Sequence, residues 1–541
     1  MELKKTTYVL LSLVIITAVL SAINCKKAED KNFVTSNEIE AHIRFLSDDL
    51  LEGRAVGSRG LEIAALYQEN HFRSLDLEPF FKDSYLQEVV LKGCTPDTNA
   101  SFEIFSELEP IDREFKLVDD FVVTSFREDN PEGVEGELLY CGYLIQAPER
   151  DWDDIKGADL KGKVLLVEIN EPGNYPDGIF EGEDMTYYGR WVYKYEKASE
   201  LGALGILIIH NTKGAAYGWD VVKNSNNKES FFLPEKQTNL FFQGWIHGQT
   251  AESIIEKAGF DHSQLKEKAE TVDFKPVPLG INARVRQEVS FRTVRSNNVA
   301  ALLKGTHKNK KDKYIILSAH YDHLGRDESL EGDQIYNGAV DNCSASACML
   351  SLARYYSMRP EELKVNLIFV AVTAEEEGLL GSDYFARHLP LPTSDVLANL
   401  NFEMANVWGE TEEVYAIGGK HSDLNEICAE AAEKIDVEYI PERDGELGYF
   451  FRSDQLSFAR AGIPAVWMHE GITSRGENKD FILNKTREYR ASKYHKVADE
   501  IEDDWDLNGT VQITRWANEI IKILQNREEI PQFKPTSSFR R

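Results

Sequence analysis

The sequence predicts an α/β protein in which a mixed, mostly parallel sheet is flanked by helices and a smaller β-rich domain is inserted. From Asn297 onwards, apolar strand-like runs alternate with helical stretches, which is typical of a sheet covered on both faces. A separate strand, helix and strand pattern lies between residues 130 and 265. Polar residues of metal-ligand types follow several of the later strands, where ligands of such sheets bind.

The composition is that of a globular chain. It has 541 residues, of which 42% are hydrophobic and 28% are charged, so disordered and multi-pass membrane proteins are disfavoured. The formal net charge of −30 disfavours nucleic acid and anionic lipid surfaces as partners. No CxxC pair occurs among the six cysteines, so the sequence does not indicate a zinc finger.

The N-terminus has the pattern of an export signal. Lys4 and Lys5 precede an uncharged, apolar stretch from 6 to 24, and Cys25 follows in a context that resembles a bacterial lipobox. We expect residues 1–25 to be a lipoprotein-type signal peptide and 26–34 to be a tether, giving an exported cell-envelope lipoprotein on the periplasmic or extracellular face. An uncleaved anchor helix is the alternative. Either way, contact with the membrane is expected only through an N-terminal lipid or anchor. If Cys25 is lipidated, the remaining five cysteines do not form a disulfide framework, although one or two bridges stay possible.

The first part of the main domain is predicted to span 35–129. Thr35 and Glu38 form a capping-box pattern ahead of an amphipathic helix, and a second helix is expected from Ala64 to Leu75. The predicted insertion, 130–265, contains a buried strand at 164–167, a helix at 194–201 and a strand at 206–209. Residues 212–240 read as an irregular surface loop.

The second part of the main domain is predicted to span 266–526, followed by a loose tail at 527–541. Its strands and helices alternate along the chain. The predicted strands are Asn298–Leu303, Tyr314–Ser318, Val365–Val372, Leu397–Met404 and Ala465–Met468, and the predicted helices include Ser344–Tyr356 and Asp423–Lys434.

Metal-ligand residue types follow these strands. His320 and Asp322 come after one strand, Asp341 stands before a helix, and three glutamates beginning at Glu375 follow another strand. Each has an ordinary structural explanation by itself: a surface ion pair, an N-cap, or a solvated helix start. Three acidic residues at the end of a buried strand repel each other unless a cation is present. Their joint occurrence at strand ends therefore favours a metal site.

At these residues the chain resembles peptidase family M28, a family of zinc-dependent exopeptidases that includes aminopeptidases and glutamate carboxypeptidases. The motifs that carry the resemblance are HYDHLG, GAVDN, AEEEGLLGS, NFEM and YHKVAD, with further matches at LEGR, Gly57-Ser58, Ser453-Asp454 and Gly462–Ala465. The resemblance implies a phosphorylase/hydrolase-like fold. Residues 130–265 resemble the protease-associated (PA) domain that is commonly inserted in these enzymes.

The resemblance also implies the roles of individual residues. Asp341 would bridge two metal ions, with His320 and Glu403 completing one site and Glu376 and His495 completing the other. Glu375 would be the general base for a water between the ions.

Asp322 would orient His320, and His323 would be a local hydrogen-bonding residue. Two zinc ions are implied, although cobalt and manganese also suit histidine and carboxylate ligands.

The sequence departs from the family pattern at two of these positions. Glu403 stands where Asp is commoner, and the residues after His495 are Lys-Val where Thr-Pro is usual. His469, which follows a predicted strand, is the alternative to His495 as the last ligand. Asp499 favours His495, because it offers that ring a hydrogen-bonding partner.

The leading prediction is an exported dizinc aminopeptidase acting on peptide substrates. A carboxypeptidase and a single-zinc glutaminyl cyclase of the same fold are alternatives within enzymes, and a receptor-like relative without metals is the alternative outside them. The sequence makes no prediction of the oligomeric state.

Overall fold

The computed structural model describes residues 33–540 except 107–110, 112, 130, 132, 174–177, 227 and 237. The predicted signal peptide with Cys25 lies outside these residues. Within them, no helix combines the length and the apolar character needed to cross a bilayer. The five described cysteines are all free and buried.

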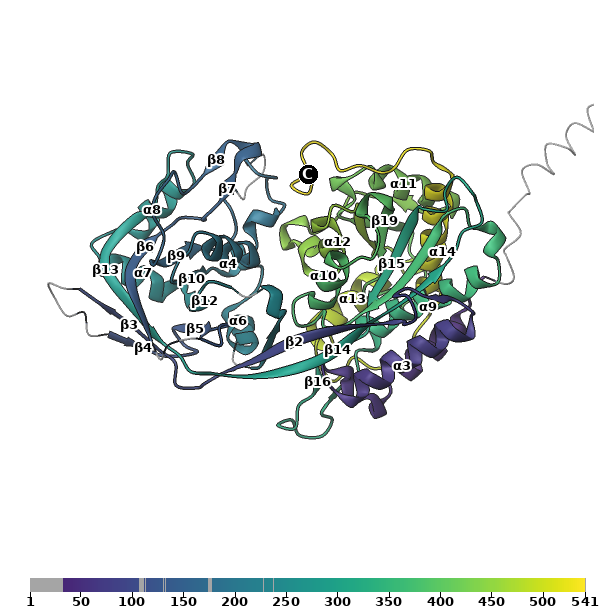
Figure 1. Ribbon diagram of the computed structural model, residues 1–541, viewed down its shortest axis with the longest axis horizontal. Helices are drawn as coiled ribbons and strands as arrows, with labels where there is room; N and C mark the ends of the chain where they lie inside the picture. Colours follow the sequence, from purple (N-terminus) through teal and green to yellow (C-terminus); the bar gives the residue numbers. More distant parts are fainter. Residues whose placement is uncertain are drawn as a thin grey trace, which may run out of the picture.

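Two sheets organise the described chain (Figure 1). Ten described strands form the main sheet, in the order β11-β2-β14-β18-β15-β19-β22-β20-β21 with β1 beside β14. Their bounds are β1 Glu78–Pro79, β2 Leu86–Pro96, β11 Ser230–Phe232, β14 Val289–Leu303, β15 Tyr314–His320, β18 Asn366–Val372, β19 Val396–Asn401, β20 Glu413–Ile417, β21 Glu438–Tyr439 and β22 Ala465–Glu470.

The main sheet is mixed, as predicted. Strands β18, β15, β19 and β22 pair in parallel at its centre, whereas β14 and β20 pair with their central neighbours in an antiparallel manner. Antiparallel pairs therefore lie on both sides of the parallel centre, and the edge strand β21 pairs with β20 in parallel.

Helices cover both faces of this sheet. They are α2 Ser36–Leu46, α3 Arg59–Ser74, α9 Ala345–Ser357, α10 Leu380–Arg387, α11 Leu424–Lys434, α12 Gln455–Arg460, α13 Phe481–Ser492 and α14 Asn508–Asn526. On β15, Ile315 and Leu317 pack into one apolar core with α2, α3, α9, α11 and α14, whereas Ile316 packs into the opposite core with α10 and α12. This alternation follows from the two-residue period of a strand.

The start of the main domain is built as its local signals predicted. Thr35 caps α2, and its hydroxyl accepts the backbone N–H of Glu38 at 3.3 Å. The Glu38 side chain does not complete a capping box, because it pairs with Arg354 of α9. The same glutamate therefore ties α2 to the body of the sheet.

A second sheet of eight described strands forms the inserted part, in the order β4-β3-β13-β6-β9-β10-β12-β5. These strands are β3 Ser101–Phe105, β4 Arg113–Phe115, β5 Phe121–Thr124, β6 Val134–Tyr140, β9 Val164–Glu168, β10 Gly205–His210, β12 Phe242–His247 and β13 Val277–Arg286. Helices α4 Trp191–Glu200, α7 Gly248–Lys257 and α8 His262–Ala269 accompany them.

The structure corrects two predictions about the insertion: its limits and the irregular loop at 212–240. The second sheet begins at Ser101 and ends at Arg286, so the predicted limits of 130 and 265 are too narrow. Residues 212–240 are not an irregular loop: they contain the short helices α5 Thr212–Ala215 and α6 Trp219–Asn226 and the strand β11, which joins the main sheet beside β2. The sequence signals were weak there because these elements are short.

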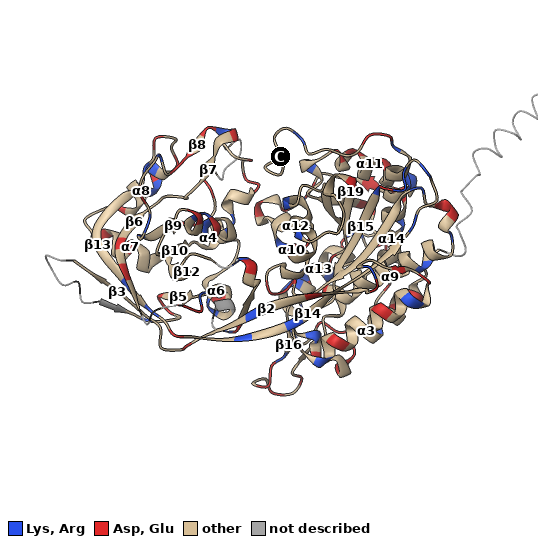
Figure 2. Cartoon of the chain, viewed as in Figure 1, with Lys and Arg blue, Asp and Glu red and all other residues tan. Residues whose placement is uncertain are grey.

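A continuous antiparallel ribbon connects the two parts. Strands β2 and β14 pair from Leu86 with Val299 to Pro96 with Val289, and the chain then continues on both sides into the second sheet. In Figure 1 this ribbon runs from the lower side of the left-hand part into the right-hand part. Acidic and basic residues are interspersed over both of them (Figure 2).

The predicted loose tail is wrong. The backbone of Lys534 donates to His421 at 2.9 Å, and Phe539 is buried against Phe450 with ring centroids 5.5 Å apart. The tail carries few apolar residues, but it buries the aromatic ones in the core that also holds α12.

Candidate metal centre

The predicted site residues meet at the carboxyl ends of the central parallel strands. His320 is the last residue of β15, the glutamates at 375 and 376 follow β18, and Glu403 follows β19. Asp341 comes from the turn before α9, and His495 from the segment after α13. Because parallel strands end at the same edge, residues far apart in sequence share one site.

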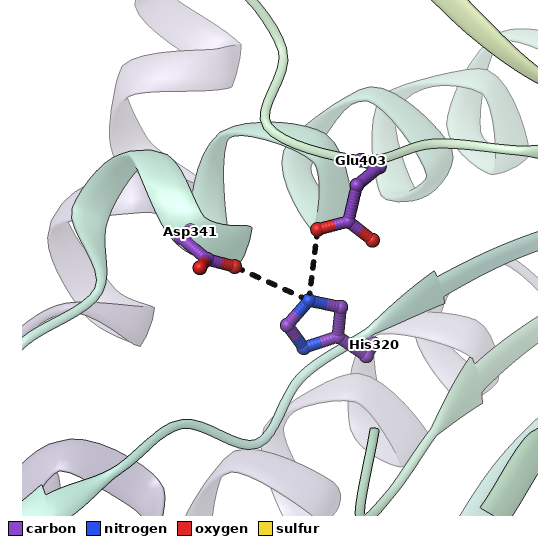
Figure 3. A group of neighbouring side chains, drawn as sticks. All are labelled: His320, Asp341 and Glu403. Carbon is purple, nitrogen blue, oxygen red and sulfur yellow. Dashed lines mark hydrogen bonds and ion pairs between the residues drawn. The ribbon is translucent and has the colours of Figure 1, made fainter. Parts of the chain in front are cut away.

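The first group consists of His320, Asp341 and Glu403, which are all buried (Figure 3). His320 Nε2 lies 3.1 Å from Glu403 Oε1 and 3.3 Å from Asp341 Oδ1. One ligand atom from each residue lies within 4.8 Å of the others, which is close enough for a single ion.

The second group shares Asp341. His495 Nε2 lies 3.2 Å from Asp341 Oδ2 and 3.2 Å from Glu376 Oε2. The two oxygens of Asp341 therefore face different groups, as the bridging role requires. His323 Nδ1 is 2.7 Å from Glu376 Oε1, so the local hydrogen bond predicted for it is present, although His323, Asp341 and Glu376 also lie close enough to hold an ion.

Of the two candidate histidines, the structure brings only His495 to these carboxylates. His469 stacks on Tyr415 with ring centroids 4.8 Å apart, and its Nδ1 contacts the backbone carbonyl of Glu470. Burial lowers the pKa of His469 to about 4.

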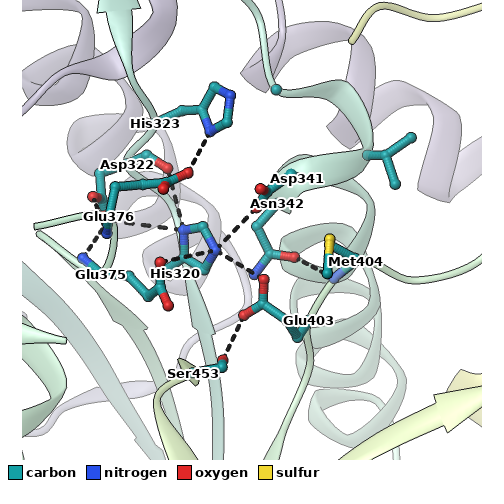
Figure 4. Close-up of polar contacts among 12 residues, drawn as sticks. His320, Asp322, His323, Asp341, Asn342, Glu375, Glu376, Glu403, Met404 and Ser453 are labelled. Carbon is teal, nitrogen blue, oxygen red and sulfur yellow. Dashed lines mark hydrogen bonds and ion pairs between the residues drawn. The ribbon is translucent and has the colours of Figure 1, made fainter. Parts of the chain in front are cut away.

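Glu375 lies beside the first group, with Oε2 at 3.8 Å from His320 Nε2 (Figure 4). Its backbone N–H donates to Asp322 Oδ1 at 3.1 Å, and that of Glu376 donates to Asp322 Oδ2 at 3.3 Å. Asp322 thereby positions the loop that carries both glutamates. Asp322 also contacts His320, as predicted: His320 Nδ1 lies 3.2 Å from the Asp322 backbone carbonyl and 3.9 Å from its carboxylate.

The carboxylate of Asp499 contacts other groups than the predicted His495 ring. Its carboxylate accepts the backbone N–H groups of Val340 at 2.9 Å and Asp341 at 3.1 Å, and the hydroxyl of Tyr489 at 2.9 Å. It therefore holds the Asp341 turn, and no contact with His495 is present among the described residues. The sequence motif indicated that Asp499 lies near the site, but it did not show which groups its carboxylate contacts.

Residues 298–518 of the chain match the model of peptidase family M28. This segment is a peptidase family M28 domain. Aminopeptidase YwaD of Bacillus subtilis is 32% identical to the chain over 316 residues, which cover 57% of this chain and 53% of that protein. Aminopeptidase Y of Saccharomyces cerevisiae is 26% identical over 220 residues, which cover 39% of this chain and 36% of that protein. The chain thus spans about half of the first relative and less of the second.

The fold of the whole described chain has a solved counterpart. The aminopeptidase from Aneurinibacillus sp. strain AM-1 matches with a TM-score of 0.52 at 21% identity, over 92% of this chain and 95% of that chain. This likeness supports the mixed α/β fold of the M28 domain together with its insertion.

Arg54 is a positioning residue of the M28 site for which the sequence analysis proposed no role. It is 1% exposed, and its guanidinium donates to the carbonyls of Tyr321 at 2.9 Å, Asn337 at 2.7 Å and Leu46. Arg54 thus connects the loop after His320 to the turn that leads to Asp341 through hydrogen bonds. The LEGR motif contains this arginine, but only the fold shows which carbonyl groups its guanidinium contacts.

The turn before Asp341 depends on a glycine. Gly338 has φ +59°, and a Cβ there would lie 2.2 Å from the Asp341 carbonyl oxygen and 2.7 Å from the His323 ring. A larger residue would push apart the two loops that supply the ligands.

Three hydrogen bonds hold Glu403 and the residue after it in place. Ser453 Oγ donates to Glu403 Oε2 at 2.7 Å, and Asn342 Oδ1 accepts the backbone N–H of Met404 at 2.8 Å. Trp467 Nε1 donates to the Glu403 carbonyl at 3.1 Å. These contacts hold the longer glutamate side chain at a position where aspartate is commoner in the family.

The donor set of the M28 domain fits divalent cations. Asp341 Oδ1 is buried and has no hydrogen-bond partner among the described residues, although His320 Nε2 is 3.3 Å away. Burial raises the pKa of Glu375 well above its usual value, and the charges of Glu403 and Glu376 add to this. Clustered carboxylates with an unsatisfied oxygen, beside histidine ring nitrogens, are what zinc binds.

Proposed function

We propose that the chain is an exported dizinc metallo-exopeptidase of the aminopeptidase type, which hydrolyses N-terminal residues of peptides. The observation that carries this proposal is the pair of residue groups that share Asp341, with the carboxylate of Glu375 beside them at 3.8 Å from His320, in an M28 domain. The names of the relatives from Bacillus subtilis and yeast support the N-terminal direction.

His320, Asp341 and Glu403 would hold one zinc ion, and Asp341, Glu376 and His495 the other. When bound, such ions polarise a scissile carbonyl and make a nearby water more acidic. Glu375 accepts a proton from the water that attacks the scissile carbonyl carbon, and it donates this proton to the amine when the C–N bond breaks.

Export and anchoring are proposed on sequence grounds. The basic residues Lys4 and Lys5, the apolar stretch after them and the lipobox-like context of Cys25 support a lipoprotein. Detergent-phase partitioning of the wild type and of Cys25→Ala tests the anchor.

The test of the activity uses peptides with free and with blocked N-termini. We expect release of residues from free N-termini only, loss of activity with a chelator, and recovery when zinc is added back. Cleavage of blocked peptides from the C-terminus would instead assign the carboxypeptidase direction.

Replacing the base separates catalysis from metal binding. Glu375→Gln should keep the zinc content and lower kcat by about 100- to 10,000-fold, because the variant cannot accept the proton. Glu377→Gln, on the same loop, is the matched control and should keep most of the activity. Full activity of Glu375→Gln would refute the proposed base.

A further inference from the structure

A cavity of about 360 Å³ lies in the insertion, at the carboxyl ends of three parallel strands. The strands β9, β10 and β12 pair in parallel and end at Glu168, His210 and His247, and all three of these residues line the cavity. Helix α7 begins directly after β12, and α8 contributes His262 and Lys266 to the wall. Because ligands of α/β sheets bind outside the carboxyl ends of parallel strands, a ligand of the insertion is expected here.

His210 lines this cavity and keeps one ring nitrogen without a partner. The residue is 6% exposed, and its Nε2 lies 3.0 Å from the carbonyl oxygen of Tyr217. A carbonyl oxygen can only accept, so Nε2 carries the hydrogen and Nδ1 is left as an acceptor. Burial lowers the pKa of His210, so the ring is neutral at neutral pH. Nδ1 has no hydrogen-bond partner among the described residues, and a ligand with an N–H donor suits it.

Charged side chains of both signs line the same cavity. Glu252 of α7 is exposed and has no ion-pair partner in the described part of the chain. Lys266 Nζ lies 3.8 Å from Glu168 Oε2, whereas Glu168 Oε1 lies 2.7 Å from His262 Nε2. The ammonium group of Lys266 has three N–H donors, so it can serve a second acceptor. The wall therefore offers a carboxylate for a cationic group and an ammonium for an anionic one.

A metal ion does not suit this cavity. Of the residues that the structure describes, the only His, Cys, Asp and Glu groups close enough to hold an ion are the two at the M28 site. A simple anion would meet the carboxylates of Glu168 and Glu252, and a simple cation would meet the ammonium of Lys266. The volume lies in the range of sites for small organic molecules, and a zwitterion matches charges of both signs.

One short helix links this cavity to the junction with the M28 domain. Thr212, the first residue of α5, lines it and also lines a second cavity of about 280 Å³. The second cavity is lined by Lys213 of the insertion and by Glu446 and Leu447 of the M28 part. A ligand beside Thr212 therefore contacts the segment that forms the wall of the junction.

We propose that the cavity at the ends of β9, β10 and β12 binds a free α-amino acid as its zwitterion. The ammonium group of the ligand donates to His210 Nδ1 and to Glu252, and its carboxylate accepts from Lys266. The inference rests on the proposed function, because free amino acids are the products of an aminopeptidase. It makes the insertion a sensor of product.

Binding is tested with an amino acid and two analogues that each lack one charge. Leucine should raise the Tm of the purified full chain, because it binds the folded state. N-acetyl-leucine lacks the ammonium group and leucinol lacks the carboxylate, so we expect neither to raise the Tm. Equal shifts with all three compounds, or no shift with leucine, would overturn the recognition of a zwitterion.

Substitutions in the cavity separate it from the M28 site, where a product can also bind. Glu252→Gln and Lys266→Met should each weaken leucine binding by about tenfold or more in titration calorimetry, because each removes a charged hydrogen-bond partner. Glu256→Gln and Lys268→Met are the matched controls and should bind leucine as the wild type does, since both residues are exposed on the same two helices and do not line the cavity. Unchanged affinity in both cavity variants would assign leucine binding to the M28 site and overturn the proposal.

Failure of this inference and failure of the proposed function give different results. Leucine binding that depends on Glu252, in a chain that hydrolyses no peptide, would refute the function and keep the cavity site. Peptide hydrolysis by a chain that binds no leucine outside the M28 site would refute the cavity site and keep the function. If Lys266→Met does not fold, Glu252→Gln still decides, because that side chain is exposed.

Discussion

At the residue scale, Asp341 is the centre of the site. Its Oδ1 faces His320 at 3.3 Å and its Oδ2 faces His495 at 3.2 Å, so its two oxygens serve separate groups. The backbone of the Asp341 turn is held by Asp499, and the loop of Glu375 and its neighbour by Asp322. Two buried carboxylates therefore act on backbone N–H groups and fix the positions of the carboxylates available to metal.

The two histidine candidates can be separated by metal content. His495→Ala removes the ring next to Glu376, so we expect the chain to lose about one zinc ion and most of its activity. His469→Ala is the matched control, because that ring stacks on Tyr415 away from the ligand groups, and zinc content should be unchanged. Metal analysis of the purified variants by mass spectrometry checks this. A full complement of zinc in His495→Ala would contradict the assignment.

At the scale of the element, the loops that carry the ligands are held together by a buried arginine. Arg54 comes from the segment between α2 and α3, and its guanidinium donates to the last carbonyl of α2 and to carbonyls in two loops. Elements far apart in the chain are thereby held in fixed positions relative to one another. Buried donors of this kind are costly to remove, because each acceptor is left without a partner.

Arg54→Met should therefore destabilise the M28 domain. Three carbonyls, those of Leu46, Tyr321 and Asn337, lose their donor, and we expect the free energy of unfolding to fall by roughly 3 kcal/mol. Arg73→Met, at an exposed ion pair on α3, should change it by less than about 0.5 kcal/mol. Thermal unfolding of both variants measures this difference in stability. Equal Tm values would contradict the stabilising role of Arg54.

The C-terminal segment is a second structural element that stabilises the M28 domain. Phe539 packs against Phe450 and His421, with ring centroids 5.5 and 5.4 Å away. Phe539→Ala should lower the free energy of unfolding by about 3 kcal/mol, because a buried aromatic ring is lost. Phe481→Ala, at a ring that is 36% exposed, should have a smaller effect. Denaturant titration of the two variants compares them, and a stable Phe539→Ala would show that the tail adds nothing.

At the scale of the whole molecule, the two sheets are joined by paired strands. β2 and β14 pair along eleven residues each, from Leu86 to Pro96 and from Val299 to Val289. Ion pairs add side-chain contacts between the parts, such as Lys420 with Glu181 at 2.9 Å and Arg460 with Glu196 at 2.8 Å. Because exposed pairs contribute little, the ribbon is the main connection.

The M28 domain should survive removal of the insertion. Pro96 pairs with Val289, so residues 98–287 can be replaced by an Asn-Gly turn that closes a hairpin between β2 and β14. We expect a folded chain that keeps its zinc, because every candidate ligand lies outside the insertion, between His320 and His495. Circular dichroism and metal analysis check this outcome. An unfolded chain without zinc would show that the insertion is required for the fold.

Much of this architecture was predictable from local patterns. The strands from Asn298 to Met468, the helix after Thr35 and the grouping of His320, Asp341 and Glu403 follow from apolar periodicity, a cap and short motifs. Features with weak local signals were missed: β11 is three residues long, and the tail buries Phe539 in spite of its polar composition. Short elements gain their stability from distant partners, which a local pattern does not contain.

The sequence by itself determined the alternation of strands and helices, the chemical types at the strand ends and the family of the domain, because these properties depend on residues close together in the chain. The tertiary structure decided the rest. It brought His495, and not His469, to Asp341, and it placed the Arg54 guanidinium between the carbonyls of Tyr321 and Asn337. These pairings depend on how distant loops meet at the ends of parallel strands, and the packing of helices on the two faces of the sheet determines that geometry.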